Sequence, residues 1–197
     1  MDIKTLFAIT GSIIGIVFTI PYIIDIFRRK TEPHSYSWLV WTILQATGVL
    51  AMLASGAGIG ILYLSLSTGM CALIFVLSLR FGTKNVTSFD LVCLVSALSA
   101  LFVWFFMHDA LLSIIMVSCI DFIGFLPTFR KAYADPFTET VSNYFSGGVA
   151  QVLSLASLSE YHLTTSLYLI ALALANFIFT TMVLLRRMQL QRAELRK

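Results

Sequence analysis

The chain has 197 residues, of which 58% are hydrophobic and only 12% are charged. A soluble protein carries about 25% charged residues, so this composition excludes an ordinary water-soluble domain and favours lipid as the solvent. The formal net charge is only +3, and the basic residues stand at the ends of apolar runs, which argues against a surface for nucleic acid.

Seven apolar runs, bounded by charges, glycines and prolines, follow one another along the chain. Each has close to the 20 residues that a helix needs to cross a bilayer. The predicted spans cover residues 5–27, 38–55, 59–79, 89–107, 110–130, 141–158 and 162–185. The first run is too long for the core of a signal peptide and lacks a small-residue cleavage site, so we expect it to remain as a helix.

The basic residues indicate how the spans are oriented. With the N-terminus outside and the spans alternating, twelve of the thirteen Lys and Arg residues fall on the inner side, and Lys4 falls outside. This is the positive-inside pattern of membrane proteins. We therefore expect a multi-pass protein of the plasma (inner) membrane with a cytoplasmic C-terminus, whose basic tail is weakly attracted to anionic lipid.

The chain repeats itself at an offset of 106 residues. The matched pairs are Pro21 with Pro127, Trp38 with Tyr144, Gln45 with Gln151, and Arg80 with Arg186. Spans one to three therefore recur as spans five to seven, and a period of four helices makes both triplets parallel. The expected fold is an all-α membrane protein with two parallel three-helix bundles joined by a linker helix (3+1+3).

This organisation divides the chain into four segments. The first bundle covers residues 1–80, and the linker with the fourth span covers 81–108. The second bundle covers 109–186, and a basic cytoplasmic tail covers 187–197.

Two loop motifs follow the repeated prolines: "FRRKTEPHSYS" and "FRKAYADPFTETVS". Together with the 3+1+3 order they resemble the PQ-loop and SWEET superfamily, although Tyr22 and Thr128 stand where PQ-loop proteins have Gln. The SWEET prolines of helices 2 and 6 are missing here, where Pro33 and Pro136 lie in the preceding loops. The resemblance implies a transporter of a small polar solute that works by alternating access.

The repeated prolines Pro21 and Pro127 suggest paired hinges. A proline inside a helix removes one hydrogen bond and clashes with the carbonyl four residues back, which creates a kink. Hinges at the inner ends of spans one and five would open and close a cytoplasmic gate. The alternative is that membrane helices simply tolerate proline.

Polar side chains at membrane depth are the candidate binding residues, since they need partners or a water-filled cavity. Gln45 and Gln151 are related by the repeat, so we expect them to face each other across its axis; structural bonds between helices are the alternative. The resemblance implies a solute contact for Asn176, whose repeat partner is Met70. Ser67 and Thr68 lie nearby as substitutes.

Asp121 is a carboxyl in an apolar run, and its repeat partner is Gly15. A buried carboxyl is cheapest when protonated, so Asp121 could couple protons to transport or bind a cationic substrate; a bond to a neighbouring helix is the alternative. Trp41, one turn after Trp38, is either an interface anchor or a stacking surface for a planar ligand.

Other functions fit the sequence in part. A receptor of the KDEL-receptor type shares this architecture but needs a charged pocket, and a PnuC-like carrier of vitamins or nucleosides would use the Trp38–Trp41 pair. A light-driven pump needs a lysine in the last span, which this sequence lacks. No metal-ligand spacing or nucleophile–base pair predicts an enzyme, and we expect no cofactor.

Overall fold

The structure, a computed structural model, describes residues 2–83, 87–107 and 109–195. Within these ranges the chain forms seven α-helices and two short 3₁₀ helices (η), without a β-strand. The elements are α1 (Ile3–Phe27), α2 (Ser35–Ala54), η1 (Gly58–Ile61), α3 (Leu62–Phe81), α4 (Ser88–Met107), α5 (Ala110–Ala134), η2 (Pro136–Thr138), α6 (Val141–Ala156) and α7 (Leu163–Glu194). The seven expected helices are therefore confirmed.

Five stretches of the described chain are long and apolar enough to cross a bilayer: α1, α2, η1 with α3, α5 and most of α7. They support an all-α protein embedded in a membrane. α6 has 16 residues and is therefore about 24 Å long, shorter than a hydrocarbon core of about 30 Å.

The helix ends follow local chemistry. Asp109 is the N-cap of α5, and its Oδ1 accepts a hydrogen bond from the Leu112 backbone N–H at 2.8 Å. Between α2 and η1, Gly56 and Gly58 adopt φ angles of 77° and 65°, a left-handed conformation that glycine accepts without steric cost. The two glycines therefore allow the tight turn that leads from α2 into η1.

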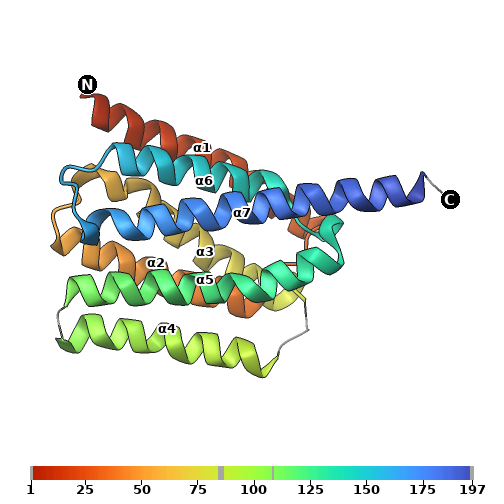
Figure 1. Cartoon of the computed structure of the whole chain (residues 1–197), viewed down its shortest axis with the longest axis horizontal. Coiled ribbons are helices and arrows are strands. Elements are labelled where there is room, and N and C mark those ends of the chain that lie inside the picture. Colours follow the sequence, from red (N-terminus) through yellow and green to blue (C-terminus); the bar gives the residue numbers. More distant parts are fainter. Residues whose placement is uncertain (1, 84–86, 108, 196–197) are drawn as a thin grey trace.

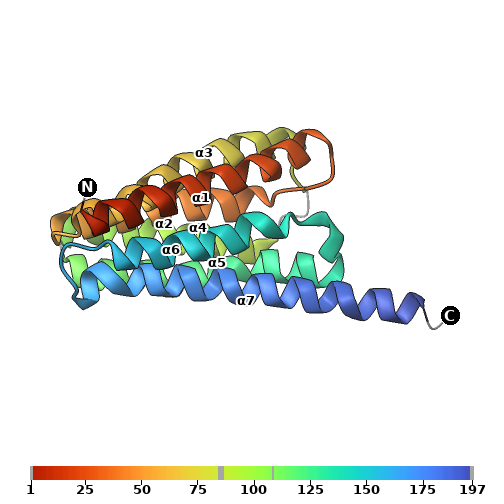
Figure 2. The same ribbon diagram turned by 90° about the horizontal axis from the view of Figure 1, so that it is seen from above.

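α7 is longer than the sequence predicts. The apolar run ends at Leu185, but the helix continues to Glu194. The residues after Leu185 are mostly Arg, Gln, Met, Leu and Ala, which are strong helix formers even when they face water. The tail that we expected to follow the last span is therefore in large part its helical extension, which projects beyond the bundle (Figures 1 and 2).

The helices pack in a regular order. α1 contacts α3 and α6, α2 contacts α3, α4 and α5, and α7 contacts α5 and α6. α4 lies at the edge of the bundle against α2 and α5 (Figure 1). Viewed at right angles, α1 and α3 lie on one side of the molecule and α6 and α7 on the other (Figure 2).

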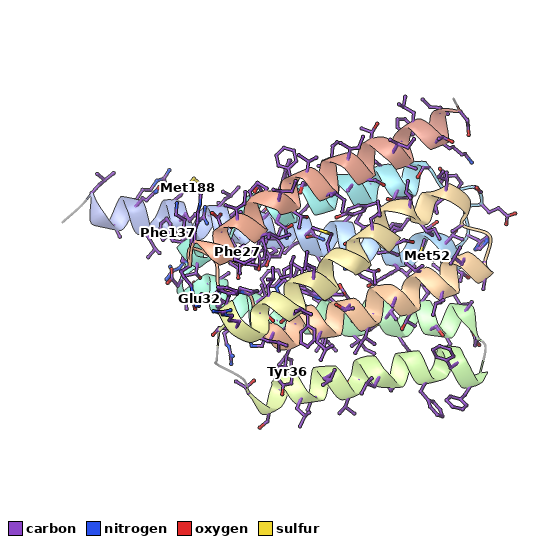
Figure 3. The ribbon with its side chains drawn as sticks, turned by 180° about the vertical axis from the view of Figure 1, so that it is seen from behind. Phe27, Glu32, Tyr36, Met52, Phe137 and Met188 are labelled. Carbon is purple, nitrogen blue, oxygen red and sulfur yellow. The ribbon has the colours of Figure 1, made fainter. Side chains whose placement is uncertain are left out.

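One end of the bundle carries most of the basic residues, and we call it the basic end. Phe27, Glu32 and Phe137 lie there, Met188 lies on the projecting part of α7, and Met52 lies toward the opposite end (Figure 3). The loop after α1 is tied to the end of α3, because the Thr83 N–H donates to the Pro33 carbonyl at 3.1 Å.

Both repeated prolines lie within continuous helices. α1 continues through Pro21 to Phe27, and α5 continues past Pro127 to Ala134. The Pro21 side chain is on the exposed face of α1, and the side chain of Pro127 lies outside the described part of the chain. The expected hinge motion at these positions stays a prediction.

The surface of the bundle is apolar. Val17, Val76 and Leu174 are each at least half exposed, at 50%, 60% and 55%. A soluble monomer rarely exposes large continuous apolar surface, whereas lipid accepts it. The buried interior forms two clusters, one of mainly aliphatic side chains and one rich in aromatic rings toward the basic end.

Candidate functional site

A cavity of about 60 Å³ lies in the middle of the bundle. Its lining comes from α1, α2, α3, α5, α6 and α7. The polar lining residues are Thr19, Gln45, Ser67, Asn143, Gln151 and Asn176, and the aromatic ones are Trp38, Trp41, Tyr63, Phe125 and Tyr144. None of the described lining residues carries a formal charge, so the cavity offers amides, hydroxyls and rings.

Gln45 of α2 and Gln151 of α6 both line this cavity and are 7% and 3% exposed. Gln45 Nε2 lies 3.4 Å from Cys71 Sγ, a weak acceptor. Within the described chain, the Oε1 atom of neither glutamine has a hydrogen-bond partner. A buried acceptor left unpaired costs about 1–3 kcal/mol, so each oxygen would be stabilised by a hydrogen-bond donor placed beside it.

Trp41 contributes both a ring and a donor. It is 4% exposed, and its ring centroid lies 4.7 Å from that of Phe125 and 5.1 Å from that of Trp38. Its Nε1–H has no partner among the described residues. Trp38 and Trp41 are therefore both buried in the cavity wall. This burial favours the stacking surface over the interface anchor, and the role of Trp41 stays a prediction.

Asn176 lines the cavity from α7. Its Nδ2 donates to the Leu172 carbonyl of its own helix at 2.8 Å, which leaves Oδ1 directed to the neighbouring α6. A Cβ atom at Gly147 would lie 3.4 Å from this oxygen and 3.5 Å from the Tyr63 hydroxyl. The small size of Gly147 therefore keeps space open beside two polar groups.

Asp121 and Thr68 do not belong to the described lining. Asp121 is buried, at 2% exposed, and its Oδ1 lacks a partner among the described residues. Phe125, one helical turn further along α5, does line the cavity. The Thr68 hydroxyl donates to the Leu64 carbonyl of its own helix at 2.8 Å, and its neighbour Ser67 takes the place in the wall.

Sequence reasoning missed several lining residues. Thr19 of α1 donates to Asn143 Oδ1 of α6 at 2.9 Å, and Tyr63 enters the wall from α3. Hydroxyls and tyrosines are common in membrane helices, so their type alone gave no signal. The repeat does give a signal, because lining residues occur in pairs that are 106 positions apart. Thr19 pairs with Phe125 in this way, and Trp41 pairs with Gly147.

Hydrogen bonds join the α1–α2 and α5–α6 connections at the basic end. Thr140 donates to Asp25 Oδ2 at 2.8 Å, so its one proton is used and it accepts from the Thr31 hydroxyl at 2.6 Å. Lys131 Nζ donates to the Glu32 carbonyl at 2.5 Å. These contacts hold together two connections that are about a hundred residues apart in the chain.

Glu139 links the cavity wall to this end. Its carboxylate accepts from Lys131 Nζ at 2.9 Å and from the Tyr144 hydroxyl at 3.0 Å, and its carbonyl accepts from Arg187 Nη2 at 2.6 Å. Burial raises the pKa of the Glu139 carboxyl, and the charge of Lys131 opposes this shift. The sequence reading assigned Glu139 no role.

Comparison of the chain with protein-family models, with curated proteins and with solved structures finds no match. The likeness to the PQ-loop and SWEET superfamily therefore rests on the two loop motifs and the order of the helices.

Proposed function

We propose that the protein is a seven-span membrane transporter that moves a small polar solute by alternating access. The observation that carries the proposal is a polar cavity lined by residues from six helices, with unpaired amide oxygens on α2 and α6. Buried polar groups without partners are expensive at membrane depth and mark solute pathways.

The 3+1+3 arrangement is part of this proposal, and the packing of the helices supports it. In the first half, α3 contacts both α1 and α2. In the second half, α7 contacts both α5 and α6 in the same way. The contacts between the halves also correspond, because α1 packs on α6 as α5 packs on α2. α4 remains at the edge, as a linker helix would.

The cavity lining supports the repeat independently. Five pairs of lining positions are 106 residues apart: Thr19 and Phe125, Trp38 and Tyr144, Trp41 and Gly147, Gln45 and Gln151, and Met70 and Asn176. A cavity on the axis between two related halves collects equivalent positions from both. This is the place of the substrate site in transporters built from repeats.

The orientation rests on charge. If the basic end faces the cytoplasm, the Lys and Arg residues follow the positive-inside rule of a plasma (inner) membrane protein. Lys4 then lies at the outer end, where its Nζ donates to the Ser159 carbonyl at 3.3 Å.

Contacts between the two halves at both ends support an occluded state. At the outer end, the Ser159 N–H donates to the Ala57 carbonyl at 3.1 Å; at the basic end, Thr31 and Lys131 contact the opposite half. A volume of about 60 Å³ holds a few water molecules rather than a sugar or nucleoside. Loading such a solute therefore requires one end to open.

Two alternatives have their own support. The aromatic wall of Trp38, Trp41 and Phe125 favours a planar solute, as in a PnuC-like facilitator. A receptor of the KDEL-receptor type is less well supported, because the described lining lacks a charged side chain.

The test begins with the purified protein and a thermal-shift screen of sugars, amino acids and nucleosides. Compounds that stabilise the protein are then offered in labelled form to liposomes that contain it. A transporter carries the stabilising compound across the bilayer and exchanges it for unlabelled compound. A compound that binds the cavity and never crosses supports the receptor.

A further inference from the structure

A groove of about 500 Å³ runs along the outer surface of α7, away from the central cavity. Its wall is largely apolar, with Phe177, Ile178, Met182 and Leu185 following the helix toward the basic end. There the groove reaches Tyr133 of α5 and Arg186 of α7. The groove is therefore largely apolar, and the cationic side chain of Arg186 lies at its end.

Arg186 is held in place at the end of this groove. Its Nε donates to the Tyr133 carbonyl at 3.1 Å and its Nη1 to Gln189 Oε1 at 3.4 Å. The guanidinium also lies over the Tyr133 ring, 4.6 Å from the ring centroid. The two hydrogen bonds use two of its five N–H donors, so further donors are available to a ligand.

The neighbouring Arg187 faces the other way. Its Nε and Nη2 donate to the Pro136 carbonyl at 3.0 Å and 2.8 Å, and Nη2 also donates to the Glu139 carbonyl. Arg187 therefore fixes the connection between α5 and α6. Arg186 also contacts α5 through Tyr133, but it lies beside the groove.

Arg186 follows directly on Leu185, where the apolar run of α7 ends. In a membrane this is the level at which hydrocarbon meets lipid headgroups, and basic pockets between helices on this side attract anionic lipid. An apolar groove at the lipid-facing surface is filled by acyl chains. A fixed guanidinium at its end pairs with a phosphate through charge-assisted hydrogen bonds.

We propose that this groove binds one anionic phospholipid of the cytoplasmic leaflet, with an acyl chain along α7 and the phosphate at Arg186. Anionic lipids are favoured over phosphatidylcholine because their phosphate charge is not balanced by an ammonium in the same headgroup. The site is separate from the central cavity, so it holds whether or not the proposed solute transport is correct.

The test compares the purified full chain with Arg186→Gln and with Arg192→Gln, which removes an equal charge from the same helix outside the groove. Native mass spectrometry counts retained phosphatidylglycerol, and thermal unfolding is followed with phosphatidylglycerol or phosphatidylcholine. We expect wild type and Arg192→Gln to retain one phosphatidylglycerol and to be stabilised by several degrees, and Arg186→Gln to retain at least fivefold less. Equal retention by both variants overturns the proposal.

A second variant covers the case in which Arg186→Gln folds poorly. Ile178 is 48% exposed in the groove wall, and Ile178→Trp fills the apolar part without changing charge. We expect this variant to lose the retained lipid as well. Soluble glycerol phosphate, which has the phosphate without acyl chains, should give no stabilisation; a shift equal to that from phosphatidylglycerol would show a simple anion site and refute a lipid site.

Discussion

Gln45 and Gln151 stand 106 positions apart and line one cavity from α2 and α6, each with an amide oxygen that is unpaired among the described residues. Two residues from different halves of the chain, each with an unpaired acceptor, thus line the same space. A solute with N–H or O–H groups on two sides can satisfy both.

Gln45→Leu and Gln151→Leu are each expected to reduce solute uptake by about tenfold or more. The replacement keeps the side-chain volume close to the original, but a donor of the solute left without its acceptor at a desolvated site costs about 1–3 kcal/mol. Uptake into liposomes is the measurement. Gln191→Leu, on the exposed extension of α7, is the matched control, and an equal loss there would mean that the effect is not local to the cavity.

Asp121→Asn is expected to preserve folding and solute exchange but to abolish accumulation driven by a pH gradient. Asp121 is buried with an unpaired Oδ1, and asparagine imitates the protonated carboxyl in shape. Uptake with and without an imposed pH gradient is the measurement. Asp109→Asn is the control, because asparagine also caps a helix. If wild-type uptake ignores the gradient, the protein is a passive facilitator and Asp121 is structural.

Gly15→Ala is expected to destabilise the protein by about 1–3 kcal/mol, as overpacking of a filled interior does. A Cβ atom at Gly15 would overlap the ring of Tyr63, which lines the cavity. Gly69→Ala in α3 is the control, since its Cβ would meet no atom within 4 Å. That change should raise the stability by up to about 1 kcal/mol through helix propensity. Thermal unfolding in detergent distinguishes them, and equal shifts would contradict the packing.

Glu139 is expected to make the folded state less stable as the pH rises. Its carboxyl has a raised pKa in the folded protein, so the folded state holds the proton more tightly than the unfolded state. The free energy of unfolding then falls as the pH rises from the ordinary value of 4.5 through the raised one. Among the described residues, Lys131, Tyr144 and Arg187 lower this raised pKa in part, and Tyr22 also interacts with the carboxyl.

The check is thermal unfolding as a function of pH for wild type and Glu139→Gln. The variant should lose part of the decrease in stability on the way to neutral pH. Glu32→Gln, at an exposed side chain, should leave the decrease unchanged. A steeper decrease in Glu139→Gln would show that the ion pair with Lys131 outweighs the effect of burial.

A reporter fused to the C-terminus should be active only on the cytoplasmic side, and one at the N-terminus only outside. The positive-inside rule predicts both. Green fluorescent protein and alkaline phosphatase fusions report the two compartments. Phosphatase activity at the C-terminus would reverse the orientation or change the number of spans.

The helices were predictable because lipid imposes one length and one composition on every span, so charges and glycines stand out as boundaries. The end of α7 was not predictable in this way, because the residues after Leu185 are helix formers that extend the helix without forming an apolar run. Helix propensity, and not the burial of apolar side chains, therefore determines where α7 ends.

The candidate site was predictable only in part. Gln45 and Gln151 are polar groups that an apolar helix has no other reason to carry, and their pairing in the repeat indicated a shared location. Asp121 is equally conspicuous, yet it lies outside the described cavity lining while Phe125 lies within it. Which face of a membrane helix turns inward depends on its neighbours, because lipid-facing and buried positions are both apolar.

The two walls of the cavity are related by the repeat but are not alike. Trp41 faces the space from one half where the other half has Gly147, and Asn176 corresponds to Met70. Between identical walls, a solute would fit equally well in two orientations related by the axis. Between these unlike walls one of the two orientations has the lower energy, so a bound solute should turn the same side toward Trp41 each time it enters the cavity.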